Sequence, residues 1–314
     1  MSAPRIALVV NPTSGVGRAA KISEAVAGRL RAGAQVTVLA GTSAAHAIDL
    51  IAAAAQQHDA VAVLGGDGMV HLALQALAGG DTPLGIIPGG TGNDVADVLG
   101  FPADPLVTAD LVLSAVLASS VRRVDLGRTA AGTWWATVLC AGFDSAVNAR
   151  ANRMTWPKGP RRYDLAIAAE MLRLRPYRFR LDLDGEPMEV LATLVAIGNG
   201  PQYGGHKQMT PDGRMDSGEF AVTVVGPVSR LTLARLAPKL PNAGHIGHPA
   251  ITTYTAREVG LTALGEDAEP GRIVSFADGE PISPLPVITT CVAAALPVLV
   301  PPGVIGRAFA GPAD

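Results

Sequence analysis

The first 120 residues alternate short apolar runs with longer stretches of helical periodicity, and this alternation restricts the fold more than any other feature of the chain. Strands that alternate with helices in this way are typical of a parallel sheet with helices on both faces. In such sheets ligands bind beyond the carboxyl ends of the strands. The expected strands are residues 6–10, 35–40, 60–64 and 84–87, and the expected helices are about 17–31, 44–57 and the segment that follows GGDG at 65–68.

The pattern changes near Ser120 to short β-like runs separated by turn residues. One helical pattern, YDLAIAAEMLRLRP at 163–176, interrupts these runs. We therefore expect two domains, because a mostly antiparallel sheet does not continue a parallel βα series. The first is an α/β domain over 1–121 to which the chain returns over about 293–314, and the second is a mostly antiparallel β domain over 122–292.

Composition excludes several classes of function. The formal net charge is −2 and aromatic residues make up 4% of the chain, so it has neither the field nor the stacking platforms expected of a nucleic-acid binder. Cys140 and Cys291 stand alone, which disfavours disulfide frameworks and zinc sites and favours the cytoplasm. No export signal is visible at the start. The most apolar segment, 287–300, contains Pro297 and is shorter than the roughly 20 residues of a spanning helix, so we expect a buried strand pair.

Two glycine clusters follow the third and fourth expected strands: GGDG at 65–68 and GGTGND at 89–94. Backbone amides freed by such turns, together with the positive end of the next helix, favour an anion. On this interpretation a side chain at Gly66 or Gly90 would occupy the space of a phosphate. The simpler alternative is a pair of strand-to-helix turns in which Asp67 is only a cap or turn residue, with Thr91 or Asn93 capping the following helix.

Two other nucleotide motifs fit less well. NPTSGVGRA at 11–19 contains a GxGxxA pattern, but the second strand ends in Ala40, Gly41 and Thr42, without the acid that would hold a ribose. A GxxxxGK[ST] sequence is absent. The phosphate therefore is expected on the two glycine clusters and not on a dinucleotide or Walker-type loop.

A set of motifs in fixed order resembles the diacylglycerol kinase catalytic family, which includes bacterial soluble diacylglycerol kinases, sphingosine kinases and ceramide kinases. The motifs are NPTSG at 11–15, Thr42 with His46, GGDG at 65–68, GIIPGGTGND at 85–94, VDLG at 124–127, NGPQYGG at 199–205 and DGE at 278–280. The bacterial soluble enzymes are the most similar group. The resemblance implies an ATP-binding α/β domain of the phosphofructokinase and NAD-kinase type and a β-sandwich-like second domain that accepts the lipid.

The resemblance also implies which residues bind ATP. The triphosphate is expected on the loop at 65–71 and at Thr91, with Asn11 and Thr42 beside the nucleotide. The implied set is Asn11, Thr42, Gly65, Gly66, Asp67, Gly68, Met69, Val70, His71, Gly90, Thr91, Gly92 and Asn93.

Magnesium is the second implied ligand, because phosphoryl transfer depends on positioning and on neutralising phosphate charge. By resemblance Asp67, Asp94 and Asp125 are linked to it, partly through water, which suits a hard cation. For Asp125 a simple strand-edge acid is an equal alternative. Asp216 matches an accessory metal loop at 210–220, but Ser217 replaces the usual acid there. Other departures are Met69 for the usual Thr and Leu72 for a frequent acid.

The acceptor hydroxyl requires a general base, and the tetrapeptide DGEP occurs twice, at 184–187 and 278–281. Either copy could be an Asp-Gly hairpin turn. The resemblance favours the later copy, so Glu280 is the expected base, with Asp278 beside it. Asp67 remains a rival.

The expected reaction is ATP-dependent phosphorylation of a lipid alcohol such as diacylglycerol. A kinase for sphingosine or ceramide, an NAD-kinase-like enzyme and a non-catalytic binding protein are the alternatives. The basic cluster of Arg150, Arg153, Lys158, Arg161 and Arg162 around Trp156 is either a solvated face or a contact for anionic headgroups, which would make the protein peripheral on the inner membrane face. The sequence leaves a homodimer open. HIGH at 245–248 is expected to be a loop, not a synthetase motif.

Overall fold

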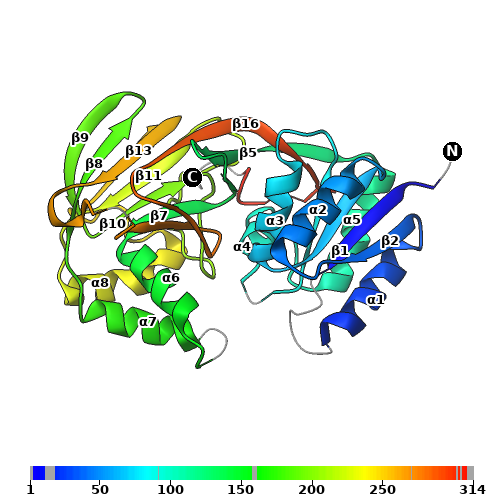
Figure 1. The fold of residues 1–314 in the computed structure, drawn as a ribbon, viewed down its shortest axis with the longest axis horizontal. Helices are drawn as coiled ribbons and strands as arrows, with labels where there is room; N and C mark the ends of the chain where they lie inside the picture. The colour runs from blue at the N-terminus through cyan, green and yellow to red at the C-terminus, as the bar shows by residue number, and fades with distance from the viewer. Residues whose placement is uncertain are drawn as a thin grey trace. The chain divides into compact units, whose positions relative to one another are not determined.

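The chain folds into two compact units in the computed structural model (Figure 1). The structure describes residues 3–10, 18–90, 92–157, 161–269, 271–301, 303–304 and 306–309. The first unit comprises 1–126 and 293–310, and the second comprises 127–292 and 311–314. The chain therefore leaves the first unit after residue 126 and returns to it at residue 293.

The first unit is built on a parallel sheet, as the alternating pattern predicts. Its strand order is β2-β1-β3-β4, and the end of β16 lies beside β4 with Val298 opposite Leu84. The strands are β1 (Arg5–Val10), β2 (Gln35–Ala40), β3 (Ala60–Gly65), β4 (Leu84–Pro88) and β16 (Val287–Leu299). The helices are α1 (Arg18–Leu30), α2 (Ala44–Ala55), α3 (Asp67–Leu77), α4 (Asp94–Val98) and α5 (Pro105–Leu117). All four predicted strands and all three predicted helices are found.

Helices cover both faces of this sheet. On one face, Ile6 and Leu8 of β1 share a core with residues of α1 and α5. Side chains alternate along a strand, so Ala7 and Val9 point to the other face. There α2 and α3 pack against one another and against β1 and β3. The carboxyl ends of the strands are left for loops.

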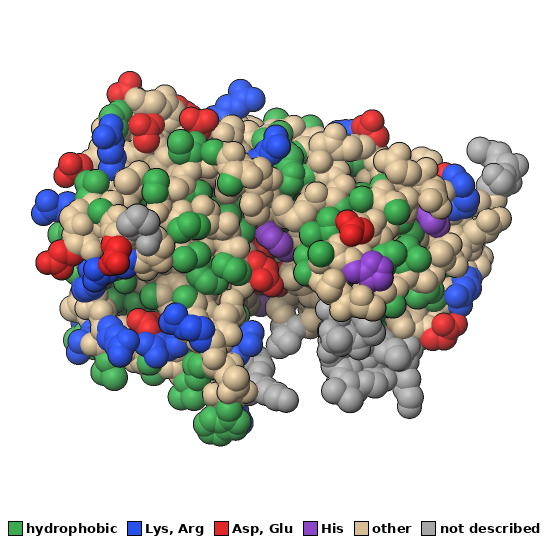
Figure 2. Space-filling view, viewed as in Figure 1, with side chains coloured by type: hydrophobic (Ala, Val, Ile, Leu, Met, Phe, Trp, Pro, Cys, Tyr) green, Lys and Arg blue, Asp and Glu red, His purple; other side chains and the backbone are tan. Residues whose placement is uncertain are grey.

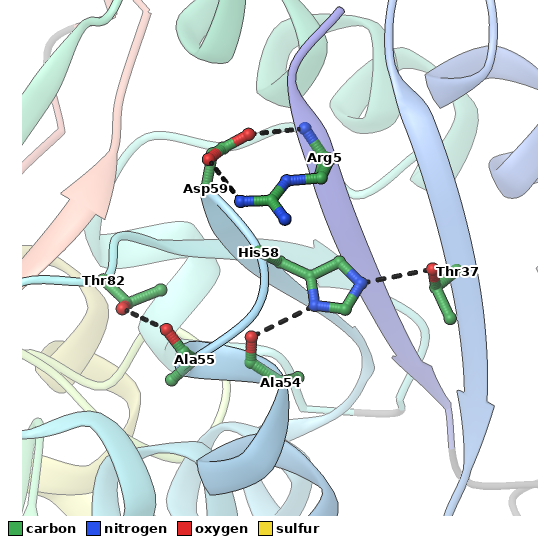
Figure 3. A network of polar contacts seen from close by, with 7 residues as sticks. All are labelled: Arg5, Thr37, Ala54, Ala55, His58, Asp59 and Thr82. Carbon is green, nitrogen blue, oxygen red and sulfur yellow. Dashed lines mark hydrogen bonds and ion pairs between the residues drawn. The ribbon is translucent and has the colours of Figure 1, made fainter.

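The opposite edge of the sheet is held by polar contacts (Figure 3). The Asp59 carboxylate accepts from the Arg5 backbone N at 2.8 Å and from Arg5 Nη2 at 3.3 Å, which lowers the pKa of Asp59. His58 Nδ1 lies 3.1 Å from the Ala54 carbonyl, which only accepts, so Nδ1 carries the proton and Nε2 accepts from Thr37 at 3.1 Å. These contacts join the loop between α2 and β3 to the start of β1 and to β2, away from the glycine loops.

The second unit is a β-sandwich. One layer is an antiparallel sheet in the order β12-β11-β10-β7-β14-β15, and the other contains β16, β13, β8 and β9. Trp135, Phe179 and Phe220 lie in the core between them, and the Trp135 and Phe220 rings stack at 5.1 Å. The strands are β5 (Val121–Thr129), β6 (Trp134–Trp135), β7 (Val138–Gly142), β8 (Tyr177–Leu183), β9 (Glu186–Ala192), β10 (Leu194–Gly198), β11 (Phe220–Val225), β12 (Ile251–Ala256), β13 (Glu258–Ala263), β14 (Val274–Ala277) and β15 (Glu280–Pro284).

In the described part of the second unit, three α-helices lie outside the sandwich layers: α6 (Phe143–Arg153), α7 (Arg161–Met171) and α8 (Arg230–Leu236). Only α7 is predicted from sequence. The polar helix α6 buries little more than Val147 and Ala151 against α7, and α8 has seven residues, so neither shows a clear apolar period. HIGH at 245–248 lies in turns, as expected.

The segment 287–300 differs from its prediction. It is one long strand, β16, and not a buried strand pair. Ala294 has a positive φ of 53°, which interrupts the regular strand geometry near the point where the chain passes between the units. Within the described residues, none of the helices is long and apolar enough to cross a membrane.

Candidate functional site

The two glycine loops lie side by side at the carboxyl edge of the parallel sheet. Gly65 pairs with Pro88 in register, and the Gly89 N donates to the Gly65 carbonyl at 2.8 Å. A Cβ at Gly90 would lie 2.4 Å from the Gly66 Cα. From the sequence, glycine is expected at 66 and 90 because a side chain would occupy the space of a phosphate. In the structure, a side chain at Gly90 would clash first with the backbone of the 65–68 loop.

Asp67 links the two loops. It begins α3, and its Oδ1 accepts from the Val95 N, in the first turn of α4, at 3.2 Å. A Cβ at Gly92 would lie 2.5 Å from the other carboxylate oxygen, Oδ2. Asp67 thus caps the helix that follows the other loop, and both of its oxygens face residues 92–95.

Asn93 does not cap the helix that it precedes. Its Oδ1 accepts from the Gly90 N at 2.9 Å and its Nδ2 donates to the Gly90 carbonyl at 3.1 Å, with a φ of 65°. These bonds close the 90–93 turn. The cap expected from Asn93 is instead supplied by Asp67, while Thr91, the other expected cap, and Asn11 lie outside the described residues.

The remaining members of the expected phosphate loop differ in exposure. Met69 and Val70 are buried. The Val70 side chain packs in the core, so Val70 could contact a phosphate only through its backbone. His71 Nδ1 is buried and has no hydrogen-bond partner among the described residues. Gly68 lies in the first turn of α3.

A cavity of about 150 Å³ opens beside these loops. It is lined by the carboxyl end of β1, by residues 41–43 after β2, by the start of α2, and by Met69 and Leu72 of α3. Thr42, also in its lining, donates from its backbone N to His46 Nδ1 at 3.2 Å, and its Oγ1 lies 2.9 Å from the same nitrogen. Nδ1 is therefore an acceptor. The two departures from the family pattern both make this cavity more apolar.

The other two acids expected near magnesium have different surroundings. Asp94 is half-buried at the start of α4. Asp125 is 4% exposed, and its Oδ1 accepts from the Ala294 N at 2.7 Å, while Arg123 donates to the Ala294 carbonyl at 3.0 Å. Asp125 therefore holds the positive-φ residue of β16, which is a structural role whatever else it does.

The donor set suits magnesium held mainly by phosphate. Across the described ranges, no three His, Cys, Asp or Glu side chains gather into a ready-made metal cluster. Magnesium commonly takes one or two carboxylates together with water and phosphate oxygens. Asp67 and Asp94, one at the start of each helix after the paired loops, are hard oxygen donors of that kind.

In the second unit the two DGEP copies are both hairpin turns, as their sequence predicts. Asp184 and Asp278 have the same φ of 54°, each followed by a positive-φ glycine. Each following glutamate, Glu186 or Glu280, is exposed at the first position of the returning strand. Local backbone therefore does not distinguish the copies.

The aspartates do distinguish them. Asp278 is 8% exposed and accepts three hydrogen bonds, from the Ala136 N at 2.7 Å, the Thr137 N at 2.9 Å and Thr137 Oγ1 at 2.7 Å. Asp184 is exposed, and within the described residues its carboxylate accepts from the backbone N atoms of Arg257 and Glu258. The later turn is thus anchored in the buried interior of its unit.

Sequence reasoning misses the half-buried acid Asp144. Asp144, in the first turn of α6, accepts from the Tyr203 hydroxyl at 2.9 Å and from Asn148 Nδ2 at 3.1 Å. Burial raises its pKa, and it raises the pKa of the neighbouring Cys140 thiol as well. Tyr203 belongs to the motif NGPQYGG. The sequence signal that could have pointed to Asp144 is its position directly after AGF, at the end of an apolar run. Neither Cys140 nor Cys291 forms a disulfide, and the Cys291 thiol donates to Asn199 Oδ1 at 3.9 Å.

The 210–220 loop is closed by its own residues. Asp216 pairs with Arg214 at 3.1 Å, and Ser217 Oγ lies 3.0 Å from the Arg214 carbonyl and 2.9 Å from the Glu219 carbonyl. The hydroxyl that replaces the usual acid therefore bonds to carbonyl oxygens within the loop. An accessory metal at Asp216 would have to compete with Arg214.

Two family models match the chain in order. The diacylglycerol kinase catalytic domain matches residues 5–129, and the YegS C-terminal NAD kinase beta sandwich-like domain matches residues 137–300. A diacylglycerol kinase of Mycobacterium tuberculosis (strain CDC 1551 / Oshkosh) is 41% identical over 306 residues, which cover 95% of each chain. The chain belongs to the diacylglycerol kinase family of lipid kinases.

More distant similarities extend over the same span. A diacylglycerol kinase of Bacillus subtilis (strain 168) is 27% identical over 263 residues, covering 81% of this chain and 84% of the relative. The crystal structure of a diacylglycerol kinase from Bacillus anthracis str. Sterne matches with a TM-score of 0.78 and 23% identity, over 97% of this chain and 100% of that one. At that identity the match establishes the fold alone. The predicted family, enzyme class and fold class are confirmed.

Proposed function

We propose that this lipid kinase transfers the terminal phosphoryl group of ATP to the primary hydroxyl of diacylglycerol, giving phosphatidic acid. The observation that carries the proposal is the pair of glycine loops locked together by Asp67 at the carboxyl edge of the parallel sheet. The named activity of the 41% identical relative supports diacylglycerol as the acceptor.

At the nucleotide end, the proposed phosphate site uses the backbone of residues 65–71 and 90–93. Freed amides and the start of α3 attract the phosphates without a Walker lysine. Thr42 and the adjoining cavity take the rest of the nucleotide. Asp67 and Asp94 would hold magnesium, which supplies charge neutralisation at the phosphates when it is bound.

At the acceptor end, we assign Glu280 as the base that takes the proton of the lipid hydroxyl. Asp278 is a weaker candidate, because three donors already occupy the oxygens of its carboxylate. Its proposed role is to position the turn that carries Glu280. Asp67 is a rival base, but its carboxylate already caps α4.

The proposed setting is the cytoplasmic face of a membrane, where a diacylglycerol acceptor resides. Peripheral association follows from the acceptor's insolubility and from the basic residues near Trp156.

The test is incubation with radiolabelled ATP and magnesium and a panel of acceptors in detergent micelles: diacylglycerol, ceramide, sphingosine and, without detergent, NAD. We expect label in phosphatidic acid and little elsewhere. Label in a sphingolipid would change the substrate, label in NAD would move the enzyme to a soluble acceptor, and no transfer to any acceptor would leave a binding protein.

A further inference from the structure

Helix α7 presents apolar side chains to solvent. Ala166 is its buried residue and packs against Val147 and Ala151 of α6. Leu165 is 47% exposed, and Leu172, seven positions on and just past the end of the helix, is 72% exposed. Positions i and i+7 lie on the same side of a helix, so these leucines form one outward stripe. A helix that only packed on the sandwich would carry them on its inner side.

Neighbouring segments extend the apolar surface. Arg230, the first residue of α8, donates to the Leu172 carbonyl at 2.5 Å, which places α8 against the end of α7. Leu231 follows it and is 59% exposed. Trp156, in the turn after α6, is 78% exposed and has the largest exposed fraction among the large apolar side chains of the described residues.

Positive charge surrounds these side chains. Arg173 and Arg235 are exposed, and so are Arg153 and Lys239. Of the two acids on α7, Glu170 is paired with Arg150 at 2.5 Å and Asp164 is exposed at the start of the helix, while α8 has none. Figure 2 shows Lys and Arg side chains in a row over this part of the second unit, with hydrophobic side chains among and below them. The chain as a whole has a net charge of −2, so the basic character is local.

We propose that this surface, defined by Trp156, Leu165, Leu172, Arg173, Leu231 and Arg235 and called here the α7–α8 face, docks on an anionic membrane. Leucines and a tryptophan interleaved with arginines match the interfacial pattern, in which apolar groups enter the headgroup boundary and guanidinium groups meet lipid phosphates. The choice of a membrane over a protein partner rests on this charge complementarity and on the proposed function, which requires access to a membrane lipid.

Binding is measured by flotation with vesicles of phosphatidylcholine alone and of an equimolar mixture of phosphatidylcholine and phosphatidylglycerol. We expect binding to the mixed vesicles only, weakened by salt. The pair Arg173→Gln and Arg235→Gln should lower the partition by roughly fivefold per charge. The pair Leu172→Ser and Leu231→Ser should lower it by about tenfold or more. Trp156 emission should shift to the blue on binding, and the shift should be lost in Trp156→Phe.

Matched controls lie on the sandwich in the same unit. Arg178→Gln with Arg180→Gln on β8 removes the same charge, and Leu191→Ser on β9 removes a leucine that is 50% exposed. These variants should bind vesicles as the unchanged protein does. All variants should phosphorylate lipid in detergent micelles at their normal rate, so failure of docking is separable from failure of the proposed activity, since flotation needs no turnover.

Equal loss in the control variants, or no loss in the face variants, would overturn the proposal. So would a change of sedimentation coefficient in Leu172→Ser with Leu231→Ser while vesicle binding persists, because the face would then contact a second copy of the chain.

Discussion

At the scale of single residues, the two DGEP turns have the same backbone conformation but differ in the burial and contacts of their aspartates. Both turns have the same φ at the aspartate, and both place an exposed glutamate at the start of the next strand. Their hairpin character is predictable because Asp-Gly favours the left-handed conformation at both positions. The burial of Asp278 is not predictable, because its donors Ala136 and Thr137 lie about 140 residues earlier in the chain.

The first prediction compares the two glutamates. Glu280→Gln should retain ATP binding and lose most of the transfer rate, on the order of 100-fold or more, because an amide of the same size accepts no proton. Glu186→Gln makes the same chemical change in the same turn and should stay active. Initial rates with diacylglycerol, together with binding of a non-hydrolysable ATP analogue, measure both effects. An inactive Glu186 variant beside an active Glu280 variant would reverse the assignment.

Asp67 carries the second prediction. Asp67→Asn keeps an oxygen that can accept from the Val95 N, so the fold should change little. Loss of the negative charge should still lower turnover by about 100-fold, because the phosphate charge is then less well neutralised in the transition state. Magnesium titration of the rate and urea unfolding are the measurements. A variant with normal turnover would reduce Asp67 to the cap that the structure already shows.

At the scale of elements, the apolar runs located β1, β3 and β4 correctly because a strand buried on both faces is a continuous apolar run. Strand β2, which has no buried residue, alternates polar and apolar residues over its first four positions. The reason for glycine at positions 66 and 90 could be predicted only in part. Sequence shows that two glycine loops follow neighbouring strands, but not that Gly66 and Gly90 approach each other so closely. Helix α6 escaped prediction because it is polar, and Val147 and Ala151 are the apolar side chains among its buried residues.

The third prediction tests loop packing. Gly90→Ala should lower the free energy of unfolding by about 1–3 kcal/mol, as overpacking does, and should weaken ATP binding by displacing the 65–68 loop. Gly28→Ala is the control: Gly28 lies in α1 with no atom within 4 Å of an added Cβ, so the helix should gain roughly 0.5–1 kcal/mol. Calorimetry measures the stability of both variants, and nucleotide titration measures their ATP binding. A Gly90 variant that binds ATP normally would refute the close-packing account.

The fourth prediction concerns the ion pair between Asp267, at the end of a 3-10 helix (Gly265–Asp267), and Arg175, just before β8. Asp267 is buried and accepts from Arg175 Nη1 at 2.8 Å and Nη2 at 2.5 Å, and these bonds are the main reason that its pKa is lowered. A lowered pKa in the folded state stabilises the fold fully above the unfolded value, about 3.9, and the contribution is lost as pH falls through the folded value.

Asp267→Asn should therefore cost about 1–3 kcal/mol at pH 7 and progressively less below about pH 4. Urea unfolding of the variant and of the unchanged protein, at pH 7 and at about pH 3, measures the difference in the free energy of unfolding. Asp164→Asn, at an exposed acid on α7, should show little change at either pH. A penalty that stayed constant down to pH 3 would indicate a packing defect and not the loss of an ionised partner.

At the scale of the whole molecule, β16 carries the chain from the second unit back to the first. Ala295, Leu296, Val298 and Leu299 are buried, and Val298 pairs with Leu84 at the edge of the parallel sheet. The last described residues also belong to the first unit, since Ala308 donates to the Val98 carbonyl at 2.9 Å. The sequence predicts a return of the chain here, but the single continuous strand could not be distinguished from a strand pair, because Pro297 indicated a break.

The last prediction follows from this return. A chain ending at Val292 lacks the part of β16 beside β4, which leaves the β4 edge unpaired and removes apolar side chains that complete the first unit's core. We expect it to lose ATP-analogue binding and to expose residues 5–126 to rapid proteolysis and hydrogen exchange. A chain ending at Phe309 keeps β16 and the contacts of Ala308, and should behave as the full chain does. If the shorter chain still bound the analogue with unchanged exchange over β3 and β4, the glycine loops would be held by residues 1–126 alone, and the return of the chain would serve only to link the units.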